Sequence, residues 1–166
     1  MDGVNVAGVP GTNSGEETDA AGPYRFEIVG HTRAPVADVW SLVSQAERWK
    51  EWTWMTRTFL IKPGSPDREG VGAVRRFAVG PFGSVEEVVE WEPPHHLGYV
   101  ARKGLPVRSY RADVRLEAEG EGTKVTWSGH LVPKVAGTGT AVLAYVRFLV
   151  AGFTRRLCAY AEATQS

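Results

Sequence analysis

The chain has 166 residues, and its 19 basic and 19 acidic side chains give a formal net charge of zero. This length suits one domain with its own hydrophobic core, and the balanced charge argues against a nucleic-acid binder, which needs a clustered basic surface. No apolar run approaches the length of a membrane span and the N-terminus lacks a signal-peptide pattern, so we expect a cytoplasmic protein without a membrane span.

Residues 1–22 are rich in Gly, Asn, Ser, Thr and acidic side chains and show no apolar periodicity. Such a composition cannot bury enough apolar surface to form a core. We therefore expect a flexible leader over residues 1–22 and a single folded domain over residues 23–166.

A strand and two short helices are predicted at the start of this domain. Apolar and polar residues alternate from Tyr24 to Thr32, which indicates a strand. Ala34-Pro35 then opens a helix, because proline suits the first helical turn. The apolar face of this helix is supplied at helical spacing by Val36, Val39, Trp40 and Val43. A second short helix is expected near residues 46–49.

The middle of the chain has the pattern of successive strands separated by turns. Glycine and proline cluster between the apolar runs, and Pro93-Pro94 ends one run because proline cannot donate to a strand ladder. The predicted strands cover residues 53–62, 71–79, 84–92, 97–103, 107–117 and 123–132.

From about Thr138 the apolar spacing changes to three and four residues, which predicts one long helix to the end of the chain. Its apolar stripe comprises Val142, Tyr145, Val146, Leu149, Phe153, Leu157 and Tyr160. A sheet and a helix of this kind each need a partner for their apolar faces. We therefore predict an α+β fold in which a curved antiparallel sheet of about seven strands wraps around the long C-terminal helix.

Several short sequence motifs occur in an order typical of one superfamily. They lie at residues 34–40, 70–77, 89–94, 104–108 with Tyr110, 122–127 and 160–162. With them the chain resembles the START-like helix-grip (SRPBCC) superfamily, in particular its bacterial polyketide cyclase/dehydrase and lipid-transport group. The resemblance implies a helix-grip fold with a hydrophobic cavity, but no single reaction, because this superfamily hosts binders, carriers, cyclases and components of larger systems.

A candidate catalytic pair lies on two neighbouring strands. By alternation Glu87 shares a face with Val85, Val89 and Trp91, which we expect to be the cavity face. Aromatic polyketide cyclases of the superfamily use a cavity arginine on a strand, and Arg76 matches that residue type. We therefore take Arg76 and Glu87 as candidate catalytic residues, with a purely structural buried ion pair as the alternative.

The numerous aromatic side chains are candidates for a cavity wall. Large rings line ligand pockets well, although core packing is the alternative for each of them. Trp52, Trp54 and Met55 fall where the second short helix meets its strand, the expected cavity mouth. The other candidate ligand-binding residues are Phe59, Tyr99, Tyr110, Trp127, Leu149 and Phe153.

The sequence offers no sign of a metal or a cofactor. No two of the four histidines have the four-residue helical spacing of a metal motif, and His95 and His96 are expected to be exposed turn residues. No nucleophile-elbow phrase and no dinucleotide fingerprint is present.

Three functions remain open at this point. The leading hypothesis is binding of a small hydrophobic or aromatic ligand, lipid or polyketide-like, in the cavity. The first alternative is a polyketide cyclase or dehydratase that uses a cavity Arg, Tyr or Glu, and the second is a stress-related or co-chaperone-like interaction protein. A dry cavity floor would favour a carrier and a polar floor would favour chemistry, while a filled pocket with an exposed apolar patch would favour the interaction protein. Homodimer formation is left open.

Overall fold

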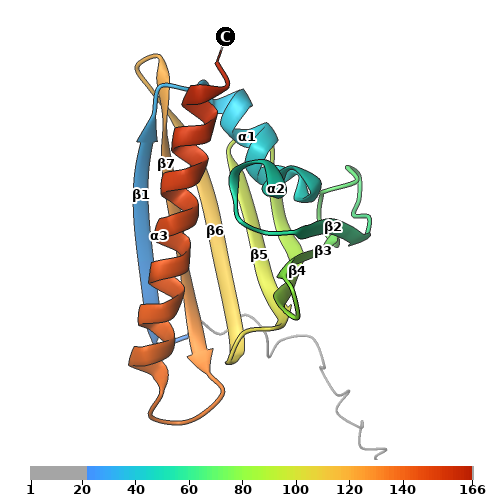
Figure 1. Cartoon of the computed structure of the whole chain (residues 1–166), viewed down its shortest axis with the longest axis vertical. Coiled ribbons are helices and arrows are strands. Elements are labelled where there is room, and N and C mark those ends of the chain that lie inside the picture. The colour runs from blue at the N-terminus through green and yellow to red at the C-terminus, as the bar shows by residue number, and fades with distance from the viewer. Residues whose placement is uncertain (1–21, 166) are drawn as a thin grey trace, which may run out of the picture.

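In the computed structural model, which describes residues 22–165, seven antiparallel strands form one sheet in the order β1-β7-β6-β5-β4-β3-β2. The long helix α3 lies along one face of this sheet, and two short helices sit beside its C-terminal half (Figure 1). The predicted helix-grip fold is therefore confirmed. The predicted flexible leader lies outside the described residues, except for Gly22.

The elements follow the predicted order closely. They are β1 (Tyr24–Thr32), α1 (Val36–Ser44), η1 (Ala46–Arg48), α2 (Trp49–Trp52), β2 (Arg57–Lys62), β3 (Val74–Val79), β4 (Phe82–Glu92), β5 (His96–Lys103), β6 (Val107–Glu119), β7 (Gly122–Pro133) and α3 (Gly139–Ala163). Strong apolar periodicity and clear Gly and Pro breaks account for this agreement.

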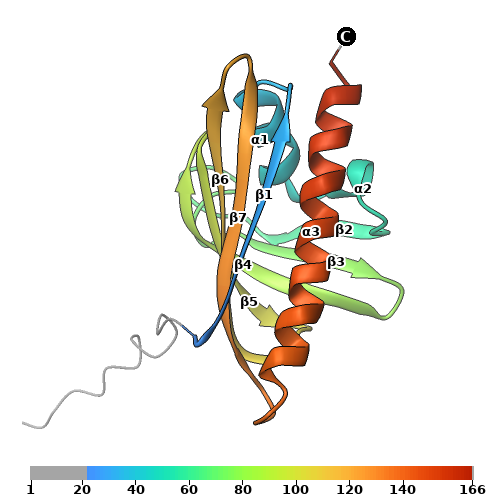
Figure 2. The same cartoon turned by 90° about the vertical axis from the view of Figure 1, so that its left-hand side faces the viewer.

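Helix α3 packs most closely against the edge strand β1 and its neighbour β7 (Figure 2). A glycine permits the close approach, since a Cβ atom at Gly30 would lie only 2.6 Å from Cγ2 of Thr154 and 3.0 Å from Sγ of Cys158. Thr154 and Cys158 are buried residues of α3 on this side, and the hydroxyl of Thr32 in β1 donates a 3.1 Å hydrogen bond to the carbonyl of Cys158. The helix is therefore seated on one half of the sheet, and the other half is covered less tightly.

The core beneath the short helices is built around Trp49. Its indole nitrogen donates a 2.9 Å hydrogen bond to the carbonyl of Val43 in α1. Its ring contacts the rings of Phe77, Trp127 and Phe153, with centroids 4.3, 5.9 and 5.6 Å away. This aromatic cluster joins the short helices, the sheet and α3 in one core.

Within residues 22–165, none of the helices combines the length and the apolar character needed to cross a bilayer.

The seating of α3 predicts a stability effect. Leu157 is fully buried, so Leu157→Ala should lower the free energy of unfolding by about 2–5 kcal/mol, the usual range for a buried leucine. Phe148→Ala on the exposed side of the same helix should change it by less than about 0.5 kcal/mol. Urea denaturation of both variants measures the difference. Equal losses would contradict this seating of the helix.

Candidate functional site

A cavity of about 280 Å³ lies between α3 and the half of the sheet formed by β3 to β6. Its walls are mostly apolar and aromatic, with Trp49, Phe77, Tyr99, Tyr110 and Phe153 among the lining residues. The polar lining residues include Ser84 and Glu86 on β4 with the two tyrosines. Glu86 and both tyrosines are buried, so they lie at the inner end, or floor, whereas the lining residue Phe82 is exposed at the mouth. The cavity floor is therefore polar, while its walls are apolar.

Most of the predicted wall residues do line this cavity. They are Trp54, Met55, Tyr99, Tyr110, Leu149 and Phe153. Trp52 and Trp127 are instead buried in the core, where their indole nitrogens donate to the carbonyl of Leu42 and the hydroxyl of Tyr99. Phe59 is largely exposed on β2, where it pairs with Arg76, and it lies outside the cavity lining.

The expected orientation of the catalytic candidates is wrong. Glu87 points to the outer face of the sheet, where its carboxylate accepts a 2.7 Å hydrogen bond from Nε of Arg102. Arg76 is partly exposed, whereas its neighbour Arg75 is fully buried and pairs with Glu86. The pair inside the protein is therefore Arg75 and Glu86.

A β-bulge explains this reversal. The pairing of β4 with β5 shifts register between Val88 and Glu90, which adds a residue to β4 at that point. Trp91 does pack inward, against Trp40 of α1, as its apolar character suggests. In a regular strand, every second residue before Trp91 would also point inward, which would select Val89 and Glu87. The extra residue at the bulge shifts this pattern by one position, so Val88 and Glu86 point inward instead.

Arg75 and Glu86 form a buried and loosely joined ion pair. Nη2 of Arg75 lies 3.4 Å from Oε2 of Glu86, and Ser84 donates a 3.3 Å hydrogen bond to Oε1. The guanidinium lies over the rings of Phe77 and Tyr99, 5.2 and 5.4 Å from their centroids. Its Nε and Nη1 atoms have no hydrogen-bond partner among the described residues. Burial raises the pKa of the Glu86 carboxyl, because desolvation outweighs the attraction of Arg75.

The two cavity tyrosines lie close together, with ring centroids 6.2 Å apart. Trp127 donates from its indole nitrogen to the hydroxyl of Tyr99 over 3.0 Å. Burial raises the pKa of both phenols, so both hydroxyl groups keep their protons at neutral pH. Tyr99 and Tyr110 therefore offer donors at the cavity floor.

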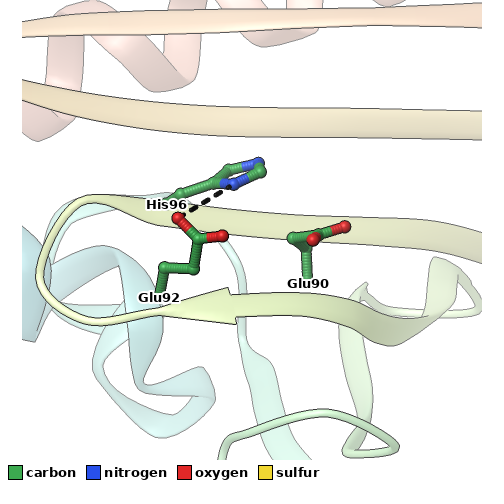
Figure 3. Close-up of side chains that lie close together, drawn as sticks. All are labelled: Glu90, Glu92 and His96. Atoms are coloured by element: carbon green, nitrogen blue, oxygen red, sulfur yellow. Dashed lines mark ion pairs between the residues drawn. The ribbon is translucent and has the colours of Figure 1, made fainter.

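A second polar cluster lies on the outer face of the sheet, around the β4–β5 corner. His96 is buried there, contrary to the expected exposed turn residue, and shares a 2.7 Å hydrogen bond with Asp113. Nδ1 of His96 lies 4.0 Å from Glu92, and Glu90 stands close by (Figure 3). Arg111 donates hydrogen bonds to both Glu90 and Asp113. Arg111 thus offsets part of the negative charge of this cluster, which lies outside the cavity lining.

The inward-facing polar residues that the sequence did not single out are Arg75, Ser84 and Glu86. The orientation of Ser84 and Glu86 follows from the bulge in β4, which no residue type marks in the sequence, and Arg75 on β3 faces Glu86. Tyr99 and Tyr110, in contrast, lie on strand segments where simple alternation holds.

The family model described as polyketide cyclase / dehydrase and lipid transport matches residues 25–162. No curated protein matches the sequence. Similar solved structures include a START superfamily protein from Mycobacterium smegmatis, at 13% identity and a TM-score of 0.71, with 84% of this chain and 97% of that chain covered.

Two further structures share the fold. Ara h 8.0201 is 15% identical with a TM-score of 0.69, and the match covers 84% of this chain and 98% of that chain. DynU16, described as a putative protein in the dynemicin biosynthetic locus, is 20% identical with a TM-score of 0.63. That match covers 84% of this chain and 47% of DynU16. At these identities the similarity establishes the fold alone.

The raised pKa of Glu86 predicts a pH-dependent stability difference. The folded protein holds this proton more tightly than the unfolded chain, so the wild type loses stability as pH rises above the ordinary value of 4.5. Glu86→Gln carries no such proton. The unfolding free energy of Glu86→Gln relative to wild type should therefore increase between pH 4.5 and neutral pH, as denaturant titrations at several pH values would measure. A difference that stays constant or falls over this range would contradict the assignment.

Proposed function

The chain belongs to the polyketide cyclase / dehydrase and lipid transport family, and we propose that it binds a small, uncharged aromatic or otherwise apolar molecule in the cavity beneath α3. The polar end of the ligand lies at the cavity floor, against Glu86 and Tyr110. The observation that carries the proposal is a largely aromatic cavity, open at one end, with a few polar groups at its buried end.

The size of the cavity supports a small ligand. Ligand pockets commonly measure about 300–1,000 Å³, and this one, at about 280 Å³, lies just below that range. A molecule of one or two rings, or a short acyl chain, matches such a volume. A long poly-β-keto chain or a complete phospholipid exceeds it.

The charges in the cavity support an uncharged ligand. Arg75 already has a carboxyl partner and is screened from the cavity by the rings around it, so it offers no free positive charge to an anion. An anionic ligand would also meet Glu86. A carbonyl or hydroxyl oxygen, in contrast, can accept a hydrogen bond from the protonated phenol of Tyr110.

One observation favours catalysis as a second candidate. The floor combines a carboxyl of raised pKa with tyrosine hydroxyl groups, and such groups serve as general acids and bases. A cyclase or dehydratase acting on a small β-dicarbonyl compound would use Glu86 to move a proton and Tyr110 to polarise the carbonyl. The interaction-protein alternative expects a filled pocket, which does not match an open cavity of this size.

Ligand binding can be tested at Tyr110. Tyr110→Phe removes the hydroxyl group and should weaken binding of small aromatic ketones by about 3- to 10-fold, the value of one hydrogen bond. The matched control is Tyr160→Phe, because the hydroxyl of Tyr160 bonds to Glu51 and is not part of the cavity lining. Displacement of a fluorescent apolar dye by a series of aromatic ketones measures both affinities.

A second variant tests the cavity itself. Leu149→Trp places a larger side chain on the lining and should abolish dye binding while the protein stays folded. If Leu149→Trp still bound the dye as the wild type does, the dye site would lie elsewhere and the proposed function would be wrong.

Catalysis is separated from binding at Glu86. If Glu86 moves a proton, Glu86→Gln should retain ligand affinity within about threefold and lower turnover of a small β-diketone by about 100-fold or more. The matched control is Glu87→Gln, next along the strand on the outer face. Equal turnover in the two variants would exclude Glu86 as the catalytic acid or base.

A further inference from the structure

Large apolar side chains gather around the mouth of the cavity and point into solvent. Phe82 is 80% exposed and Phe148 is 74% exposed, and Trp54, Val79 and Tyr145 are exposed as well. They come from three separate segments: the loop after α2, the β3–β4 hairpin and the helix α3. Figure 2 shows the tip of the β3–β4 hairpin reaching the side of the sheet on which α3 lies.

These side chains belong to one rim. Trp54, Val79, Phe82 and Tyr145 all contribute to the lining of the same cavity, and Phe148 lies one helical turn beyond Tyr145. An exposed apolar patch of this kind, at the opening of a ligand cavity, marks an interaction surface more often than chance exposure.

The rim is also basic. The guanidinium of Arg156 lies over the ring of Trp54, 5.0 Å from its centroid. Arg57 pairs across the strands with the lining residue Ala78. Both of these cations, Arg156 and Arg57, are exposed.

Little negative charge opposes them. Along α3 the only acidic residue is Glu162, near its C-terminal end. On the strand below the rim, Glu86 is buried and the carboxylate of Glu87 is held by Arg102. Exposed aromatic rings and positive charge thus coincide at the end of the molecule where the cavity opens.

We propose that this rim, formed by Trp54, Val79, Phe82, Tyr145 and Phe148 with the surrounding cations, docks on the surface of an anionic phospholipid membrane. Aromatic and apolar side chains enter the region between headgroups and acyl chains, and Arg and Lys are attracted to the negative headgroups. The docked cavity opens toward the bilayer, so an apolar ligand enters or leaves without crossing bulk water.

The charge and shape of the rim favour a membrane over the other occupants. A symmetric contact between two copies would place the cations of one rim against those of the other, which is unfavourable. A tight protein interface also needs a surface of matching shape. Separate side chains projecting from three segments fit a fluid interface, which needs no fixed complementary shape.

Vesicle flotation with the full chain tests the proposal. Wild-type protein should bind vesicles of phosphatidylcholine with about one third phosphatidylglycerol, and should bind pure phosphatidylcholine at least about tenfold more weakly. Added salt should weaken the binding to anionic vesicles.

Matched variants assign the surface. Phe148→Asp should lower binding to anionic vesicles by about tenfold or more, because it replaces an inserted ring with a negative charge. Ile61→Asp is the control: Ile61 is similarly apolar and 52% exposed, but it lies on the edge strand β2 and is not among the cavity-lining residues. Both sites are exposed, so thermal unfolding should show both variants folded.

The proposal is wrong if the wild type binds neither kind of vesicle, or if Phe148→Asp and Ile61→Asp bind equally well. It is also overturned if light scattering shows a dimer that Phe148→Asp dissociates, since the rim would then be an interface between two copies. Dye binding in the absence of vesicles reports separately on the cavity, so failure of membrane docking is distinguishable from failure of the proposed ligand binding.

Discussion

The burial of one ion pair, Arg75 with Glu86, constrains the sheet, the aromatic core and the cavity together. The two residues face each other across β3 and β4, so their pairing fixes the register of that half of the sheet. Rings from Trp49, Phe77 and Tyr99 surround the guanidinium, which ties the short helices and β5 to the same point. Removing one partner of such a pair commonly costs about 3–5 kcal/mol, because the other charge is left buried.

The cavity exists because α3 is seated unevenly. Gly30 lets the helix lie directly on β1, whereas large rings on β3 to β6 hold the opposite half of the sheet away from it. Glu86 of the ion pair and the two tyrosines form the floor of the space that remains and give it its polarity. The stability of the fold and the chemistry of the cavity thus rest on the same residues.

The sequence predicted the elements well because their periodicity is strong and their ends are marked by Gly and Pro. The aromatic wall was largely predictable for the same reason, since Tyr99, Tyr110 and Phe153 lie where strand and helix spacing hold without interruption. Glu87 was misplaced because the bulge between Val88 and Glu90 exchanges the two faces of β4, whereas Arg76 was chosen by residue type from the family resemblance. No residue type signals that bulge, so alternation pointed to Glu87 in place of Glu86. The burial of His96 was missed because it depends on Asp113, which a different strand supplies.

The central claim is that the cavity binds a small uncharged ligand with its polar end at the floor. A crystal structure of the protein with a bound one-ring aromatic ketone tests it most directly. We predict that the ketone oxygen lies within about 2.6–3.2 Å of the Tyr110 hydroxyl, with the ring packed against Phe153. A ketone bound outside the cavity, or bound inside with its oxygen directed to the mouth, would contradict this account.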